Sequence, residues 1–385
     1  MTLAERYLEL GLRLGRHVDG LVDSYHGPPD LAARVEAEPL GEPAALAEQA
    51  AALEDELADG WLRDQVHGCV TYARVLAGDP IPYADEVEQC YGVRPERVDP
   101  GIYEAAHAQL DELLPGEGTL FERRQAWRES QLVSGETVLT VFSELLPLLR
   151  RRTAELLSLP EGESVTVEAV RDEPWWAFNY YRGDLRSRVV VNVDQPTTGL
   201  DVLHLVAHEV YPGHHTERAL KEQLLVREQG LVEETIQLVP VPQALVSEGI
   251  AEVGLEVVLD DEVDEEVRSI LRRKGLVVPE RELAERIRQA NDALGTVGLD
   301  AALMIHEDGA TEAEAEAFVE RWRLVPPEQA AQNVRFATDP TWRAYTITYS
   351  AGEELCRAWL AGDPSRLRRL LTEQVRVGDL TAVVP

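Results

Sequence analysis

Apolar residues recur every three or four positions along most of the chain, which is the spacing of amphipathic helices. The stretches 43–78 and 136–159 show this spacing clearly. Clusters of proline and glycine, such as HGPPD at 26–30 and PGEG at 115–118, interrupt it where turns are expected. The pattern therefore predicts a series of helices from the start of the chain to about residue 165.

The pattern changes over residues 165–194, which are rich in the strand-forming residues Val, Tyr and Trp. Gly183, in the tetrad YRGD, suits a hairpin turn, and the stretch RSRVVVNVD (186–194) alternates well enough for a strand. Helical spacing returns at LDVLHLVAHEV (200–210) and continues towards the C-terminus. The sequence therefore predicts a mainly α-helical protein with one small antiparallel sheet.

The charge balance limits the partners that the protein can have. Seventy acidic residues against 37 basic ones give a formal net charge of −33. Such a charge repels the phosphates of nucleic acids and the headgroups of anionic lipids, so we expect neither nucleic acid nor a membrane surface as a partner. Acidic side chains on solvated helix faces, which favour solubility, are the simplest explanation of the charge.

Cysteine usage and the N-terminal sequence predict the compartment. Cys69, Cys90 and Cys356 are scattered and lack C-x-x-C spacing, so neither a disulfide framework nor a thiolate zinc site is expected. Residues 1–20 mix charges into the apolar pattern, unlike a signal peptide, and no apolar stretch reaches the length of a membrane span. We therefore expect a cytoplasmic protein.

Four of the nine histidines lie within twelve residues, in the sequence HLVAHEVYPGHH at 204–215. In an H-E-x-x-H helix, two histidines one turn apart bind zinc and the glutamate beside the first is the general base. Here Pro212 occupies the position four residues after His208. The next histidines follow six and seven residues after His208. Six residues of straight helix rise about 9 Å, too far for two imidazoles on one ion.

Pro212 and Gly213 remove this difficulty. Proline lacks an N–H and its ring clashes with the carbonyl four residues back, and glycine tolerates backbone angles that other residues avoid. A bulge of two residues places His214 where the second ligand normally lies, provided that the helix resumes in phase. His215 is aligned with His208 only on a regular helix, so we favour His214 as the metal ligand.

A hydrolytic zinc site also needs a third protein ligand, with one position left for water. The stretch 245–258 places Glu248 and Glu252 four residues apart on one face of an otherwise apolar helix. Burying carboxylates on such a face is costly unless they are paired or bind a metal. The alternative is that the histidines are solvated or satisfied in the core. The adjacent Glu209 and the position of the break favour a metal site.

The motifs HEVYPGHH (208–215) and SEGIAE (247–252) resemble the bacterial domain-of-unknown-function family 885, which belongs to the gluzincin-type zinc metallopeptidases. That family shows an H-E-x-x-P-G-H-H break followed by an E-G-W-A-type ligand helix. The segments 338–355 and 86–98 are also similar to the family, so the resemblance spans most of the chain. The chain is shorter than usual for the family, and Ile250 stands where the family usually has Trp.

The resemblance implies the roles of the site residues. The zinc ligands are His208, one histidine of the His214/His215 pair, and Glu248. Glu209 is the general base that activates a water on the zinc. Glu252 orients a ligating imidazole.

Two further roles complete the implied site. The oxyanion needs a donor besides the zinc, for which Tyr349 is the first candidate and Tyr345 the second, with aromatic packing as the alternative for both. With His214 as the ligand, His215 is expected to face the substrate or the oxyanion.

The predicted strand 186–194 also gains a role from the resemblance, because gluzincin-like peptidases hold the substrate backbone along an edge strand above the zinc helix. Peptide binding at a strand edge supplies main-chain hydrogen bonds that are independent of sequence. A hairpin that only stabilises the core is the alternative. Arg186 and Arg188 are candidates to meet a substrate carboxylate, or are solvated charges.

Together these observations predict a mainly α, gluzincin-like metallopeptidase fold with a small antiparallel sheet beside the zinc helix. Residues 1–165 are expected to cover the cleft and residues 166–385 to form the zinc-binding catalytic part, as two parts or one continuous domain. The expected function is zinc-dependent hydrolysis of peptide or peptide-like amide bonds. The alternatives are a non-catalytic or differently reactive metal protein on the same scaffold, and a helical interaction protein with a fortuitous histidine cluster.

Overall fold

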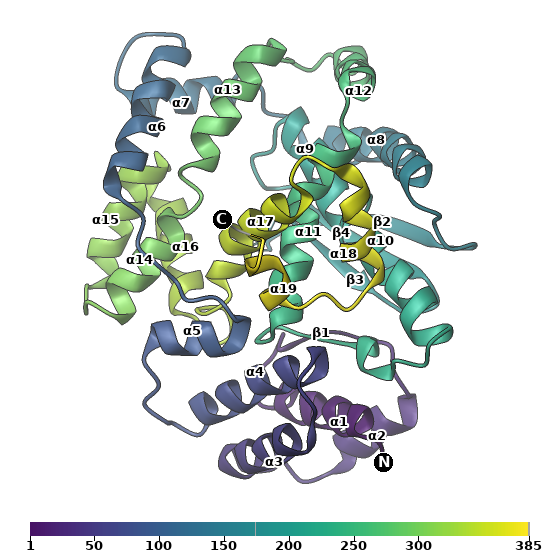
Figure 1. Cartoon of the computed structure of the whole chain (residues 1–385). Helices are drawn as coiled ribbons and strands as arrows, with labels where there is room; N and C mark the ends of the chain where they lie inside the picture. Colours follow the sequence, from purple (N-terminus) through teal and green to yellow (C-terminus); the bar gives the residue numbers. More distant parts are fainter. Residues whose placement is uncertain (174, 384–385) are drawn as a thin grey trace.

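The computed structural model describes residues 1–173 and 175–383, and it is mainly helical with two small sheets. This confirms the predicted mainly α fold. The helices form three groups around a central pair, α11 (Pro242–Val258) and α17 (Thr346–Leu360), as Figure 1 shows.

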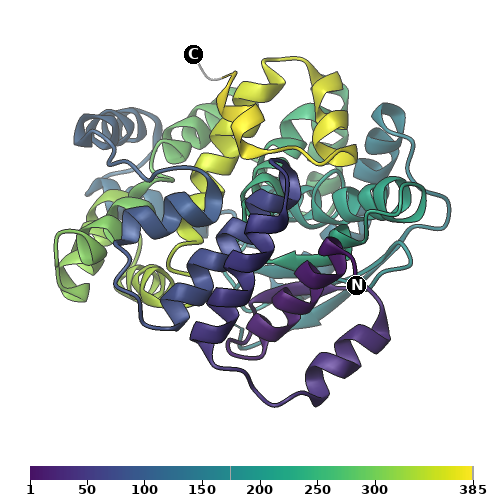
Figure 2. The same ribbon diagram turned by 60° about the horizontal axis from the view of Figure 1, so that its bottom comes forward.

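The first group contains the N-terminal helices and lies at the bottom of Figure 1. Figure 2 turns it to the front, where these helices cover one side of the molecule. Its helices are α1 (Leu3–Gly15), α2 (Pro29–Ala37), α3 (Pro43–Glu56) and α4 (Trp61–Leu76). Between α1 and α2, strand β1 (Val22–Tyr25) pairs antiparallel with β5 (Ile236–Leu238), which ties this group to the middle of the chain.

The second group lies on the left of Figure 1 and combines helices from both halves of the chain. Its members are α5 (Tyr83–Tyr91), α6 (Pro100–Leu113), α7 (Leu120–Glu129), α13 (Arg281–Asp292), α14 (Val297–His306), α15 (Glu312–Arg323) and α16 (Pro327–Thr338). Tyr103 and Leu110 of α6 share one apolar cluster with Val319 of α15 and Val334 of α16. Apolar contacts therefore cross residue 165, the boundary expected from the sequence.

The third group lies on the right of Figure 1 and surrounds a three-stranded sheet. Its helices are α8 (Gly135–Leu156), α9 (Gly199–Glu209), α10 (His214–Lys221), a π-helical turn (Glu222–Arg227), a 3₁₀ turn (Val232–Thr235) and α12 (Asp261–Arg273). After α17, the chain ends with a 3₁₀ turn (Pro364–Arg366), α18 (Leu367–Thr372) and α19 (Val377–Thr381).

The three-stranded sheet consists of β2 (Ser164–Val170), β3 (Ala177–Tyr181) and β4 (Arg186–Asn192), in the order β2-β4-β3. The predicted hairpin is present, because β3 pairs antiparallel with β4 around Gly183, whose φ of 74° suits a turn glycine. Strand β2 pairs parallel with β4, so this sheet is mixed, which the sequence analysis did not predict.

The strand expected to lie at the sheet edge is instead its centre. Strand β4, the predicted stretch 186–194, has neighbours on both sides, whereas the outer edge of β3 is bonded to no strand in the part of the chain that the structure describes. Arg186 is exposed and Arg188 pairs with Glu168 of β2. Arg186 is thus a solvated charge, Arg188 is held by an ion pair within the sheet, and the outer strands of this sheet are β2 and β3.

Two glycines bring the central helices α11 and α17 unusually close. A Cβ on Gly249 would lie 2.2 Å from the carbonyl oxygen of Gly352, and a Cβ on Gly352 would lie 2.5 Å from that of Leu245. Any larger residue would push the helices apart, since real Cβ contacts are not this short. Gly249 directly follows Glu248, so this crossing fixes the position of the predicted ligand helix relative to α17.

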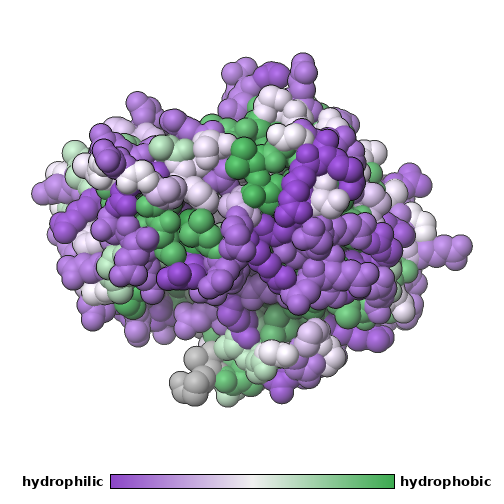
Figure 3. Space-filling model, turned by 90° about the horizontal axis from the view of Figure 1, so that it is seen from above, coloured by the Kyte–Doolittle hydropathy of each residue, from purple (hydrophilic) through white to green (hydrophobic). Residues whose placement is uncertain are grey.

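The surface agrees with the charge expected from the sequence. Figure 3 shows a face that is mostly hydrophilic, with separate hydrophobic patches. Within residues 1–173 and 175–383, no helix is long and apolar enough to cross a membrane.

Candidate metal centre

The histidine cluster folds as two helices joined by a wide turn. Helix α9 ends at Glu209 and α10 begins at His214. The N–H of Gly213 donates to the carbonyl of Ala207 at 2.8 Å, and the N–H of Thr216 donates to that of Val210 at 3.2 Å. Both bonds span six residues instead of the four of an α-helix. The turn thus absorbs the two extra residues, as the sequence analysis expected.

Gly213 is required at this turn. A Cβ at this position would lie 1.9 Å from the carbonyl oxygen of His208 and 2.5 Å from that of Ala207. Only glycine allows the backbone to pass so close to the end of α9. As a result His214 returns to the side of His208, and their ring centroids lie 4.8 Å apart with perpendicular planes.

His208, His214 and Glu248 converge as predicted. Nε2 of His208 lies 3.5 Å from Oε2 of Glu248, and Nε2 of His214 lies 3.3 Å from Oε1. Ligands at about 2.0–2.1 Å from a tetrahedral zinc ion are separated by about 3.3 Å, so this spacing suits such an ion. The three residues could hold a metal ion.

One polar atom of this group indicates that a metal ion would fit here. Oε2 of Glu248 is buried and has no hydrogen-bond partner among the described residues. A buried carboxylate oxygen without a partner is costly. Two imidazole nitrogens and a carboxylate are also common zinc ligands. The residues present therefore fit a divalent metal.

The charged side chains of this group shift one another's pKa values. Burial disfavours a charged imidazole at His208, but Glu248 and Glu252 outweigh it and raise the pKa of His208 well above its ordinary value. Burial likewise disfavours an ionised Glu248, yet His214 and His208 hold the pKa of that carboxyl far below its usual range. The site thus holds an ionised carboxylate that attracts positive charge.

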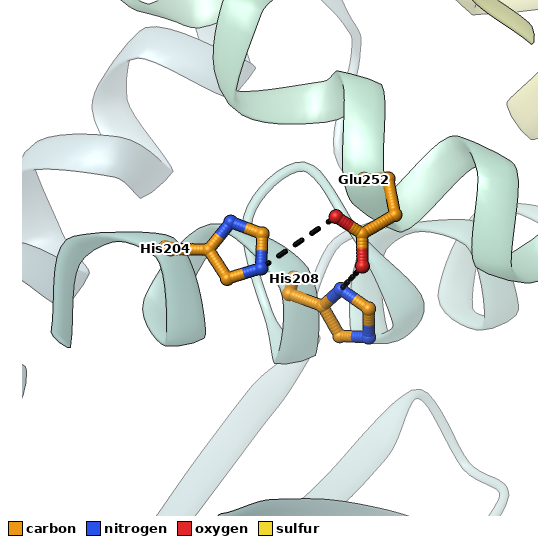
Figure 4. A group of neighbouring side chains, drawn as sticks. All are labelled: His204, His208 and Glu252. Atoms are coloured by element: carbon orange, nitrogen blue, oxygen red, sulfur yellow. Dashed lines mark ion pairs between the residues drawn. The ribbon is translucent and has the colours of Figure 1, made fainter. Parts of the chain in front are cut away.

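Glu252, to which the resemblance assigns the orientation of a ligating imidazole, lies beside His208 and His204. Its Oε1 lies 3.4 Å from Nδ1 of His208, and its Oε2 lies 3.7 Å from Nε2 of His204. Figure 4 shows this carboxylate between the two imidazoles. With the carboxylate on the side of Nδ1, Nε2 of His208 is left for a metal.

His204, His208 and Glu252 form a second group that could hold a metal. It is more exposed, because 42% of the His204 side chain is accessible against 10% of that of His214. In this second group Glu252 faces Nδ1 of His208, whereas Glu248 faces Nε2 on the other side of the ring. The first group is the better centre because Glu209 and the large cavity described below adjoin it.

His214 is held by a buried chain of polar residues that the sequence analysis missed. Its Nδ1 lies 3.3 Å from Oγ of Ser247, and that hydroxyl donates to Oε2 of Glu217 at 2.5 Å. Nζ of Lys221 donates to the other oxygen of Glu217 at 2.7 Å. Lys221 is one of only two lysines in the chain. This rarity was the one sequence signal that could have drawn attention to it.

Glu209 directly follows His208 and is the last residue of α9. It is buried at the end of α9 and lines the same cavity as His208, His214 and Glu248. Its backbone carbonyl accepts a bond of 2.5 Å from Nδ2 of Asn179 in β3. Burial raises the pKa of the Glu209 carboxyl, although His208 and His214 partly oppose the shift.

The two candidate tyrosines have different environments. The hydroxyl of Tyr345 donates to Oε1 of Glu248 at 2.8 Å, so it holds the predicted ligand. Tyr349 lies one turn further along α17, is 42% exposed and lines the cavity. Its hydroxyl makes no hydrogen bond to the residues that the structure describes. Among the described residues, Tyr345 is therefore hydrogen-bonded to Glu248 and Tyr349 is not.

The prediction that His215 faces the substrate or the oxyanion is wrong for this structure. The imidazole is completely buried. Its Nε2 lies 2.9 Å from Oε2 of Glu163, and its Nδ1 lies 2.9 Å from Oγ of Ser187 in β4. The ring turns to the sheet because α10 resumes helical geometry at His214, which sends the next side chain about 100° around the helix.

Glu163 is the centre of this second buried cluster. It also accepts a bond of 2.5 Å from the hydroxyl of Tyr211 and pairs with Arg150 at 2.6 Å. Burial alone would raise its pKa, but His215 and Tyr211 lower it to about 2. The cluster ties His215 to Ser187 of β4 and to Glu163, which directly precedes β2.

The cavity beside the metal group has a volume of about 990 Å³, which is at the upper end of the range for ligand sites. Its walls include aromatic residues that the sequence analysis did not assign: Trp175, Trp176, Phe178, Phe336 and Trp342. Strand β1 adds Asp23, whose carboxylate pairs with Arg218 of α10 at 2.7 Å. No signal in the sequence indicated Asp23, because this residue lies in a short polar strand near the N-terminus, far along the chain from the histidine cluster.

Comparison with protein-family models and with curated proteins found no match. Among solved structures, the chain is similar to one described as "the putative lipoprotein from Colwellia psychrerythraea", with 14% identity and a TM-score of 0.55. The likeness covers 92% of this chain and 68% of that one. It therefore supports the overall fold of nearly the whole chain.

The two neighbouring histidines can be separated experimentally. His214→Ala should lower zinc affinity by more than about 100-fold, because a ligand is lost and not only its support. His215→Ala should keep the metal but lose on the order of 3 kcal/mol of stability, since Glu163 stays buried with fewer partners. Zinc titration and urea unfolding measure the two effects. Zinc binding that survives His214→Ala but not His215→Ala would contradict the geometry described here.

Proposed function

We propose that this protein is a zinc-dependent hydrolase of peptide or peptide-like amide bonds. The observation that carries the proposal is the placement of Glu209 in one cavity with His208, His214 and Glu248. Three protein ligands that leave one position open, with a carboxylate beside them, form the arrangement of hydrolytic zinc sites. The resemblance of the HEVYPGHH and SEGIAE motifs to gluzincin-type peptidases supports the same function.

In this proposal, the catalytic roles belong to the zinc, Glu209 and Tyr349. Zinc, when bound, supplies Lewis acidity and lowers the pKa of a coordinated water to about 7. Glu209 accepts the proton of the attacking water and passes it to the leaving amine, and its burial keeps its pKa above that of an exposed carboxylate. Tyr349 donates a hydrogen bond to the oxygen that gains negative charge.

Substrate binding uses the edge strand β3. Trp176, Ala177, Phe178 and Asn179 line the cavity beside Glu209. An extended peptide that adds to this free edge gains main-chain hydrogen bonds. The aromatic side chains provide apolar surface for the side chains of the peptide.

Other parts of the expected function remain proposals. The cytoplasmic location and the lack of nucleic-acid and membrane partners rest on composition and charge. A non-catalytic or differently reactive metal protein is the second candidate function. His208, His214 and Glu248 would bind a metal in such a protein as well, because metal binding alone does not require that the protein catalyse a reaction.

Glu209→Gln tests the function most directly. The variant should keep the fold and about one zinc per chain while hydrolysis of a peptide library falls by about 10²-fold or more, because the proton acceptor is lost. Mass spectrometry of the library and metal analysis give both values. Wild-type protein that binds zinc but cleaves no peptide would favour the non-catalytic alternative.

The tyrosine pair provides the next test. Tyr349→Phe should lower kcat by about 100-fold with KM nearly unchanged, as expected for a transition-state donor. Tyr345→Phe should instead weaken zinc binding by about 10–100-fold, because Glu248 loses the hydroxyl that orients it. Steady-state kinetics and zinc titration distinguish these results. An unchanged kcat in Tyr349→Phe would assign the donor role elsewhere.

A further inference from the structure

The cavity has a cationic wall on the side of α15 and α16. Arg323, at the end of α15, and Arg335, on α16, both line the cavity that contains His208, His214 and Glu248. We call these two residues the arginine wall. The sequence analysis did not identify either of them.

The arginine wall has no carboxylate partner. Arg323 is half-buried, and its Nη1 donates to Oδ1 of Asn333 at 2.5 Å. Arg335 is exposed. Neither guanidinium forms an ion pair with any carboxylate in residues 1–173 and 175–383. Burial also lowers the pKa of Arg323, as expected for a cation without a counter-charge.

A third guanidinium lies behind Arg323. Arg124 of α7 donates to the carbonyl of Leu324 at 3.0 Å and to Oδ1 of Asn291 at 3.3 Å. It too lacks a carboxylate partner among the described residues. Burial, together with repulsion from Arg128 and Arg323, lowers the pKa of Arg124 to about 10. Arg323 and Arg124 are thus neighbouring guanidinium groups, neither of which has a carboxylate ion pair among the described residues.

This arrangement is unusual for the chain. Acidic residues outnumber basic ones by 70 to 37, so most arginines have a carboxylate within reach. Arg218, which lines the same cavity, is paired with Asp23 at 2.7 Å. A net charge of −33 also repels anionic ligands in general, so an anionic group of a substrate needs a local cation.

We propose that the arginine wall binds a carboxylate of the peptide substrate. This inference rests on the proposed function, and it specifies the class of peptide that the same cavity takes. Guanidinium groups bind carboxylates through paired, charge-assisted hydrogen bonds. The carboxylate comes either from the C-terminus of the peptide or from an acidic side chain. Both present the same chemistry to the arginine wall.

Four acetylated peptides distinguish the two sources. Acetyl-tetraalanine is compared with its C-terminal amide, and acetyl-Ala-Glu-Ala-Ala amide is compared with its Gln analogue. Binding is measured by calorimetry on zinc-loaded protein that carries Glu209→Gln, so that the peptides stay intact. We expect one carboxylate-bearing peptide to bind about tenfold or more tightly than its neutral partner. A change of about this size in affinity is what one hydrogen bond between charged groups contributes.

Arg323→Gln and Arg335→Gln, singly and together, should remove this preference and leave the neutral peptides unaffected. The exposed Arg335 can be replaced with little risk to folding. Arg321→Gln is the matched control, since Arg321 lies on the same helix but its guanidinium is stacked over Trp322. A tighter binding of the C-terminal acid identifies the C-terminus as the source, and a tighter binding of the glutamate peptide identifies a side chain.

The inference is contradicted if none of the four peptides binds or if all bind equally. It is also contradicted if the preference persists in the double variant, which would assign the carboxylate to the metal. Hydrolysis by the wild type is measured in parallel. Arginine-dependent binding without hydrolysis contradicts only the proposed function. Hydrolysis without an arginine-dependent preference contradicts only this inference.

Discussion

The passage of Gly213 against the end of α9 is the contact on which the site depends. Its backbone lies so close to the carbonyl oxygens of Ala207 and His208 that no side chain fits. The turn brings His214 back beside His208, six residues later, at a distance that a straight helix cannot give. The same turn sends His215 into the sheet. Without it, the two histidines would lie on different turns and Glu248 would have one imidazole to meet.

A second constraint is the cost of burying charge. Glu248 and Glu217 are buried in a protein that already carries a large negative charge, and each is matched by local partners. Glu217 has Lys221 and Ser247, whereas Glu248 has the imidazoles of His208 and His214 and the hydroxyl of Tyr345. The close crossing of α11 and α17 at Gly249 accompanies the hydrogen bond from Tyr345 to this carboxylate. Glu248 and the two imidazoles together could hold a metal ion.

The helices and the hairpin could be predicted because they depend on local spacing, and the return of His214 to His208 because it depends on a single break. Glu248 was predicted from a carboxylate pair on an apolar helix and from the family resemblance, since its approach to the histidines is a contact between residues far apart in the chain. The sequence could not predict β1, the central position of β4 or the direction of His215, because these depend on contacts between residues far apart in the chain. The arginine wall was missed for the same reason. Nothing in the sequence around Arg323 indicates that α15 and α16 border the cavity.

The central claim is that one metal ion binds between Nε2 of His208, Nε2 of His214 and the carboxylate of Glu248. A crystal structure of the zinc-loaded protein, with anomalous scattering recorded at the zinc edge, tests it directly. The account predicts a single strong peak about 2.0–2.2 Å from these three residues. A peak bound to Nδ1 of His208 together with His204 and Glu252, or no peak beside His214, would contradict it.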